Sequence, residues 1–120
     1  MPLGKKLIGI GIDSVAWGRV ERFLESHSPE SVARLLSPAE QKSFRATSRK
    51  LQFFARSFAA KEAFFKASGG GWMGREAGLR QIEIVMEEAS RFRVASDFRT
   101  EGEFFETPDG IAARVVVWKK

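Results

Sequence analysis

The stretch RSFAAKEAFFKASGGG occupies residues 56–71 and predicts the central element of the fold. Phe54, Phe58 and Phe65 are spaced by four and seven residues, which places them on one side of a helix and indicates packing on a core. We expect this helix to run from about residue 49 to 68, because three consecutive glycines beginning at Gly69 follow it.

Three charged side chains interrupt this apolar stretch. Glu62 and Lys66 are four residues apart and share one face of the helix, while Lys61 directly precedes Glu62. An ordinary Glu–Lys pair at this spacing stabilises a helix by only about 0.2–0.5 kcal/mol, and Lys61 could be an exposed lysine. Burying an unpaired ion is costly, so charges in an apolar stretch need either solvent or a binding partner. The alternative is therefore that these three side chains line a functional cleft.

On the N-terminal side, LIGIGI (residues 7–12) predicts a strand that other backbone approaches closely through its glycines. Asp13 ends this strand and, with Ser14, offers a cap for the next helix. The sequence SPAE, from residue 37, is a capping box with proline at the first helical position. Three helices are expected before the central one, at residues 15–26, 29–36 and 37–47.

After the glycines the hydrophobic pattern changes from helical to alternating. Strands are expected at residues 81–86, 91–96, 102–106 and 111–118. Pro108-Asp109-Gly110 is typical of a turn between the last two. Helices followed by an antiparallel meander predict an α+β fold, with a long central helix packed on a mostly antiparallel sheet. No repeat or linker divides the chain, so we expect one domain over residues 1–120.

The composition excludes several classes of function. The 120 residues include no cysteine and one histidine, His27, which excludes disulfides, thiolate zinc sites and multi-histidine metal clusters and favours a cytoplasmic location. No run approaches the ~20 apolar residues that span a bilayer, so no membrane partner is expected.

The net charge of +5 is unevenly distributed. Residues 1–60 hold ten Lys and Arg against five Asp and Glu, whereas residues 61–120 hold ten of each. An acidic partner docking on the N-terminal half and a mildly basic solvated surface both remain open. A nucleic-acid-binding module is disfavoured, because the phenylalanines form a helical stripe instead of alternating with Lys and Arg on strands.

Asp13 and Glu62 are candidate metal ligands. If the strand and the central helix met, their two carboxylates could hold one hard divalent cation, with water or phosphate oxygens completing an octahedron. Lys61 and Lys66 would then neutralise the charge of a phosphate. A divalent cation together with lysines is typical of sites that catalyse phosphoryl transfer. The purely structural alternative for Asp13 is that it only caps the following helix.

The segments GIGID (9–13) and FAAKEAFFKA (58–67) together resemble the two signature motifs of the 4'-phosphopantetheinyl transferases. Chain length, spacing and LLSPAEQKSF (35–44) are similar to the small branch, the holo-acyl-carrier-protein synthases. The resemblance implies transfer of the phosphopantetheine arm of coenzyme A to a serine of an acidic acyl carrier protein, with release of adenosine 3',5'-bisphosphate. The carrier protein could belong to fatty acid biosynthesis or to secondary metabolism. The alternative is a catalytically degenerate relative that binds carrier protein or coenzyme A without transfer.

The resemblance also implies roles for the motif residues. Asp13 and Glu62 would bind Mg²⁺, and Glu62 or a metal-bound water would accept the serine proton. Lys66 would hold the phosphates, and Lys61 would assist beside the metal at the edge of the cleft.

Binding of the two substrates would extend beyond the motifs. Coenzyme A contacts are expected at Arg56, Gly69 and Gly70, and the resemblance implies carrier-protein docking on Arg19 and Arg22. It further implies a homotrimer with active sites between subunits.

Some positions depart from the family pattern. Ala16 stands where a Glu usually supports the metal. Ser57 stands where an Arg usually precedes the Phe of FAAKEA, with Arg56 one residue earlier. Thr107 falls about where the family carries a histidine, whereas His27 is expected on the surface at a helix end or loop.

Overall fold

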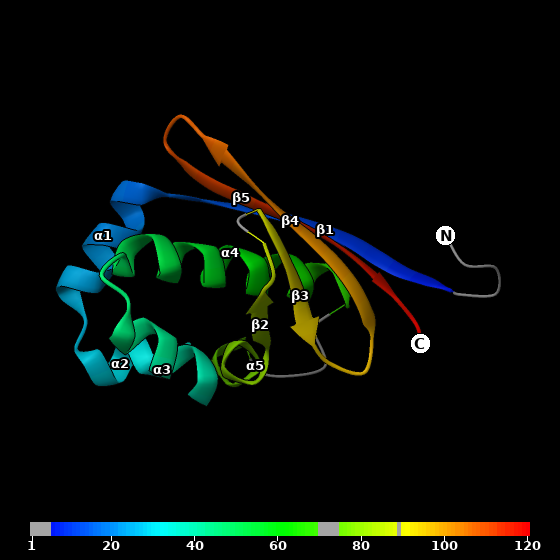
Figure 1. Ribbon diagram of the computed structural model, residues 1–120, viewed down its shortest axis with the longest axis horizontal. Coiled ribbons are helices and arrows are strands. Elements are labelled where there is room, and N and C mark those ends of the chain that lie inside the picture. Colours follow the sequence, from blue (N-terminus) through cyan, green and yellow to red (C-terminus); the bar gives the residue numbers. More distant parts are fainter. Residues whose placement is uncertain (1–5, 70–74, 89) are drawn as a thin grey trace.

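A five-stranded antiparallel sheet carries one long helix on one face in the computed structural model, which describes residues 6–69, 75–88 and 90–120 (Figure 1). The elements in chain order are β1 (Leu7–Ala16), α1 (Trp17–Ser26), α2 (Pro29–Ala33), α3 (Pro38–Ala46), α4 (Lys50–Ala67), α5 (Arg75–Gln81), β2 (Glu83–Met86), β3 (Arg91–Ala95), β4 (Arg99–Thr107) and β5 (Gly110–Trp118). The strand order is β1-β5-β4-β3-β2. The predicted α+β fold is confirmed.

The central helix α4 lies along the sheet and forms the middle of the core (Figure 1). It ends at Ala67, after which Gly69 takes a left-handed φ of 72° that a glycine adopts without strain. The predicted helix and its glycine stop are confirmed at Gly69, and Gly70 and Gly71 lie outside the described residues. Four alanines of α4 are fully buried, and Ala63 among them packs against Gly11 of β1.

Two glycines bring the backbone of β1 against α4. A Cβ on Gly9 would lie 2.2 Å from the carbonyl oxygen of Ala67, and one on Gly11 would lie 1.9 Å from that of Ala63. The close backbone approach expected from LIGIGI is confirmed. Because side chains alternate along a strand, Asp13 shares the face of the glycines and is directed toward α4.

β1 is longer than predicted, and the first helix starts later. Ala16 pairs with Gly110 of β5, so Asp13 lies inside the strand and not at its end. α1 has no side-chain cap, and the N–H of Trp17 donates instead to the carbonyl of Asp109 at 2.8 Å. The prediction of a cap by Asp13-Ser14 is wrong, because pairing with β5 continues past both residues and the β4–β5 turn supplies the cap.

The remaining elements follow the predictions with shifted ends. The capping box is present, with the Glu40 N–H donating to Ser37 Oγ and the Ser37 N–H donating to Glu40 Oε1. The strand expected from residue 81 starts at Glu83, because the short helix α5, which no pattern predicted, continues through Gln81. The turn at Pro108-Asp109 is confirmed.

One hydrophobic cluster joins α4, the helices α1, α2 and α3, and the inner face of the sheet. Phe54 is buried as predicted, but Phe58 and Phe65 are only partly buried, and Phe64 is the helix's other fully buried aromatic residue. In the described part of the chain no helix has the length and apolar character needed to cross a membrane.

Candidate active site

The two sequence motifs meet where β1 crosses α4. Lys66 donates a hydrogen bond from Nζ to Oδ1 of Asp13 at 2.8 Å, and a longer one to the carbonyl oxygen of Ile12 at 3.3 Å. The exposed fractions are 19% for Asp13 and 54% for Lys66, so this ion pair is open to solvent. The structure therefore brings a carboxylate of the GIGID segment and an ammonium of the KEAFFKA segment into direct contact.

Glu62 lies one helical turn before Lys66 and on the same side of α4. It is 4% exposed. Ala63, the next residue, carries the carbonyl against which Gly11 packs, so this turn of α4 lies under β1. Asp13 and Glu62 thus come from two facing elements that are packed together.

The donor chemistry of this pair suits magnesium. Both side chains offer carboxylate oxygens, the ligands that Mg²⁺ prefers. Among residues 6–69, 75–88 and 90–120, no group of three or more His, Cys, Asp or Glu side chains could hold a metal ion. Water and substrate phosphate would have to supply the remaining oxygens, since exposed Ala16 adds no donor. By donor chemistry alone, the two carboxylates could contribute two oxygens to such a shell.

Lys61 lies in the core and not at the edge of this site. Its side chain is 1% exposed, and Nζ donates to the carbonyls of Leu35 at 2.9 Å and Leu79 at 2.8 Å. The third partner is the carboxylate of Glu40. The predicted place beside the metal is wrong, because adjacent residues of a helix point about 100° apart. Burial lowers the pKa of Lys61, and the neighbouring Glu40 carboxylate only partly offsets this.

Glu40 is the centre of a buried network that no sequence pattern revealed. Its Oε1 accepts the N–H of Ser37 at 2.8 Å, and its Oε2 accepts the N–H of Ile84 on the edge strand β2 at 2.7 Å. With Lys61, it ties α3 to α4, α5 and the sheet. The capping box predicts the bond between Glu40 and Ser37. The bonds of Glu40 to Ile84 and Lys61 join residues far apart in the chain, so no local sequence pattern predicts them.

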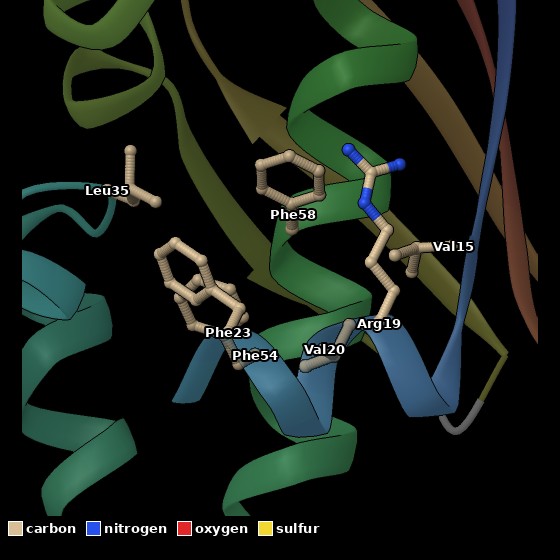
Figure 2. A pocket seen from close by; sticks show the side chains of 7 residues that line it. All are labelled: Val15, Arg19, Val20, Phe23, Leu35, Phe54 and Phe58. Carbon is tan, nitrogen blue, oxygen red and sulfur yellow. The ribbon is translucent and has the colours of Figure 1, made fainter. Parts of the chain in front are cut away.

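An apolar cavity of about 160 Å³ opens beside α1. The residues that line it are Val15, Arg19, Val20, Phe23, Leu35, Phe54 and Phe58. Figure 2 shows the Arg19 side chain rising from α1 toward the space between Val15 and Phe58, so a guanidinium stands at an otherwise apolar hollow. Arg22 is also exposed, and its Nη1 would lie 3.3 Å from a Cβ on Gly18, so the glycine leaves room for it.

A second hollow of about 200 Å³ holds two arginines, Arg49 and Arg56. The guanidinium of Arg56 lies over the Phe104 ring at 5.7 Å, and its buried Nε has no hydrogen-bond partner among the described residues. Ser57 is fully buried and contributes nothing to this hollow. No pattern pointed to Arg49, because a single arginine before a helix has no distinctive spacing.

The remaining expected residues line neither hollow. Glu106, and not Thr107, lines the hollow that holds Arg56. Gly69 is exposed at the end of α4, and Gly70 lies outside the described residues. His27 is exposed at the end of α1, as expected, with its ring stacked on Phe23 at 4.0 Å.

Known proteins resemble this chain in both sequence and fold. The family model described as the 4'-phosphopantetheinyl transferase superfamily matches residues 9–118. A holo-(acyl-carrier-protein) synthase of Listeria welshimeri is 35% identical over 115 residues, which cover 91% of this chain and 96% of that protein. The resemblance inferred from GIGID and KEAFFKA is confirmed.

Two solved structures agree with the fold over nearly the whole chain. The holo-(acyl-carrier-protein) synthase of Neisseria meningitidis superposes with a TM-score of 0.79 at 27% identity, covering 92% of this chain and 98% of that one. That of Bacillus anthracis, in complex with CoA (3',5'-ADP), has a TM-score of 0.76 at 27% identity and covers 95% and 98%. With both motifs in contact and the family matched from end to end, this chain belongs to the 4'-phosphopantetheinyl transferase superfamily.

Proposed function

We propose that this protein transfers the 4'-phosphopantetheine arm of coenzyme A to a serine of an acyl carrier protein, with Mg²⁺ held by Asp13 and Glu62. The observation that carries the proposal is the contact of Lys66 with Asp13, which joins the two motifs in one place. The holo-(acyl-carrier-protein) synthase relatives, one of them in complex with CoA, support the same reaction.

Different residues of this chain would have different roles in the transfer. The serine oxygen forms a bond to the phosphorus next to the pantetheine arm as the bond within the pyrophosphate breaks, and adenosine 3',5'-bisphosphate leaves. Glu62 accepts the serine proton, and Lys66 donates hydrogen bonds to the phosphates. Magnesium, when bound, supplies positive charge that stabilises the leaving phosphate. Lys61 has no direct part, because its ammonium is enclosed by three acceptors.

The hollow that holds Arg49 and Arg56 is suited to the phosphates of the nucleotide half of coenzyme A. Two guanidinium groups reach one pocket, and one buried N–H of Arg56 has no acceptor among the described residues. A phosphate oxygen would satisfy this donor. Arginine is also the side chain whose fork geometry matches phosphate best.

The surface around α1 is suited to an acidic carrier protein. Arg19 and Arg22 are exposed on this helix, and the apolar cavity beside them can take one apolar side chain of the partner. Electrostatic attraction would steer the acidic carrier, and the cavity would fix its position.

The outer face of the sheet supports a homotrimer. Ile8, Ile10, Ile12 and Phe105 are large apolar residues that are 37–62% exposed there. Exposed apolar surface of this kind marks interaction sites, and copies of the chain would cover it.

A cytoplasmic location remains a prediction from the absence of cysteine.

Chromatography of the nucleotide products tests the reaction. Coenzyme A incubated with this protein, Mg²⁺ and an apo carrier protein from the same organism should yield adenosine 3',5'-bisphosphate. Omitting the carrier or adding a chelator should stop its formation. Coenzyme A that stays intact with every apo carrier protein of that organism would refute transfer and leave a binding-only relative.

A further inference from the structure

Two lysines on α4 hold their carboxylate partners in opposite ways. The ammonium of Lys61 is enclosed in the core, with two carbonyls and Glu40 around it. The ammonium of Lys66 is bound to β1 only through Asp13 and the weaker contact to Ile12, and its side chain is 54% exposed. Lys66 can therefore leave its partner at low cost, whereas Lys61 cannot.

Asp13 has much less freedom than Lys66. Its backbone is fixed in β1 opposite Ala113 of β5, and its side chain is 19% exposed. Within residues 6–69, 75–88 and 90–120, Lys66 is the one side chain that bonds to the Asp13 carboxylate. A divalent cation approaching this carboxylate would meet the ammonium already on Oδ1.

The two cations oppose each other on one carboxylate. A Mg²⁺ ligand oxygen lies about 2.0–2.1 Å from the metal, so a metal on Asp13 would stand within a few ångströms of the ammonium. Like charges at that separation repel strongly at the edge of a protein. A phosphate group next to the metal removes the conflict, because it offers the released ammonium a new anionic partner.

We propose that Lys66 is a displaceable counter-ion of Asp13, which a divalent cation must expel and which then moves to the substrate phosphate. The proposal rests on the proposed function, since it takes Asp13 as a metal ligand. Lys66 would weaken metal binding to the free protein and strengthen it when a pyrophosphate ligand is present. By linkage, the metal and coenzyme A would each raise the affinity for the other.

The test measures Mn²⁺ binding, by electron paramagnetic resonance of the free ion, with and without coenzyme A and with no carrier protein present. Lys66→Met should bind Mn²⁺ about fivefold or more tightly than the wild-type chain when coenzyme A is absent. Coenzyme A should tighten Mn²⁺ binding to the wild-type chain by a larger factor than binding to Lys66→Met.

Two variants separate the effect from a general change of charge. Lys66→Arg keeps a cation in reach of Asp13 and should bind Mn²⁺ as weakly as the wild-type chain. Lys50→Met removes the same charge from an exposed residue at the start of the same helix, where it contacts the carbonyls of Arg45 and Thr47. It should leave Mn²⁺ binding unchanged.

The outcomes distinguish the inference from the proposed function. If Asp13→Asn abolishes Mn²⁺ binding but Lys66→Met binds no more tightly than the wild-type chain, the counter-ion role is wrong and the metal site stands. If Asp13→Asn leaves Mn²⁺ binding unchanged, both the metal site and the counter-ion role are overturned. Thermal unfolding of each variant confirms that the compared proteins are folded.

Discussion

Neighbouring residues of one helix face different surroundings in this protein. Lys61 is 1% exposed and completes a buried network, whereas Glu62 stands on the side of α4 that Lys66 links to Asp13. The 100° between successive helical residues is enough to separate a structural lysine from a carboxylate on the side of the proposed site. Two charges side by side in a sequence therefore do not indicate one shared role.

Removing the buried ammonium should destabilise the fold strongly. Lys61→Met leaves Glu40 buried without its cation, and breaking a buried pair in this way costs about 3–5 kcal/mol. Urea unfolding should show that loss for Lys61→Met and a much smaller change for the exposed Lys50→Met. Equal losses in the free energy of unfolding for the two substitutions would show that the buried Lys61–Glu40 pair contributes no more to stability than an exposed lysine.

The same lysine should give stability a characteristic dependence on pH. Burial lowers the pKa of Lys61 below its usual 10.5, so the folded chain releases this proton at a lower pH than the unfolded chain. Between those two values the unfolded state binds more protons, and rising pH favours the folded state. The free energy of unfolding of the wild-type chain should therefore rise relative to that of Lys61→Met as pH approaches 10.5. A constant or falling difference in paired urea titrations would contradict this.

At the scale of elements, the contact between β1 and α4 positions the site. It depends on glycine, because a Cβ on Gly11 would lie 1.9 Å from the carbonyl oxygen of Ala63. Gly11→Ala should force the strand off the helix, at a cost of about 1–3 kcal/mol or more, and should weaken Mn²⁺ binding at Asp13. Gly18→Ala is the matched control, since its Cβ would meet only the mobile end of Arg22. A Gly11→Ala protein as stable as Gly18→Ala would contradict the close packing.

Helix α1 should govern recognition of the carrier protein alone. Arg19→Glu with Arg22→Glu reverses two charges of the proposed docking surface and should raise the carrier-protein KM about tenfold or more by losing electrostatic steering. Coenzyme A affinity should stay unchanged. Arg91→Glu with Arg93→Glu, both exposed on β3, serves as the control with the same change of charge. Equal losses for carrier protein and coenzyme A would rule out a docking role specific to α1.

Local patterns account for what the sequence could predict. The end of α4 just before Gly69, the capping box at Ser37 and the turn at Pro108-Asp109 each rest on residues close together in the chain, and all are confirmed. The start of α1 could not be predicted, because its cap is a carbonyl of Asp109, more than ninety residues away. The partners of Lys61 are also distant in the sequence, so no local spacing predicts its burial.

At the scale of the whole molecule, the exposed apolar row on the sheet should be an interface between copies of the chain. Ile10→Lys places a charge on a residue that is 62% exposed, so it should leave the fold of one chain intact and separate the assembly. Light scattering coupled to size exclusion should give a trimer mass for the wild-type protein and a monomer mass for Ile10→Lys. Ala46→Glu, on the exposed end of α3, is the control. A wild-type protein that elutes as a monomer would overturn the trimer.

The most direct test of the account is the intact mass of an apo acyl carrier protein after incubation with this protein, coenzyme A and Mg²⁺. We predict a gain of one phosphopantetheine group on a serine, lost in Glu62→Gln and Asp13→Asn and retained in Ala46→Glu. A carrier protein of unchanged mass, or a gain of equal rate with Glu62→Gln, would contradict a magnesium-dependent transfer centred on Asp13 and Glu62.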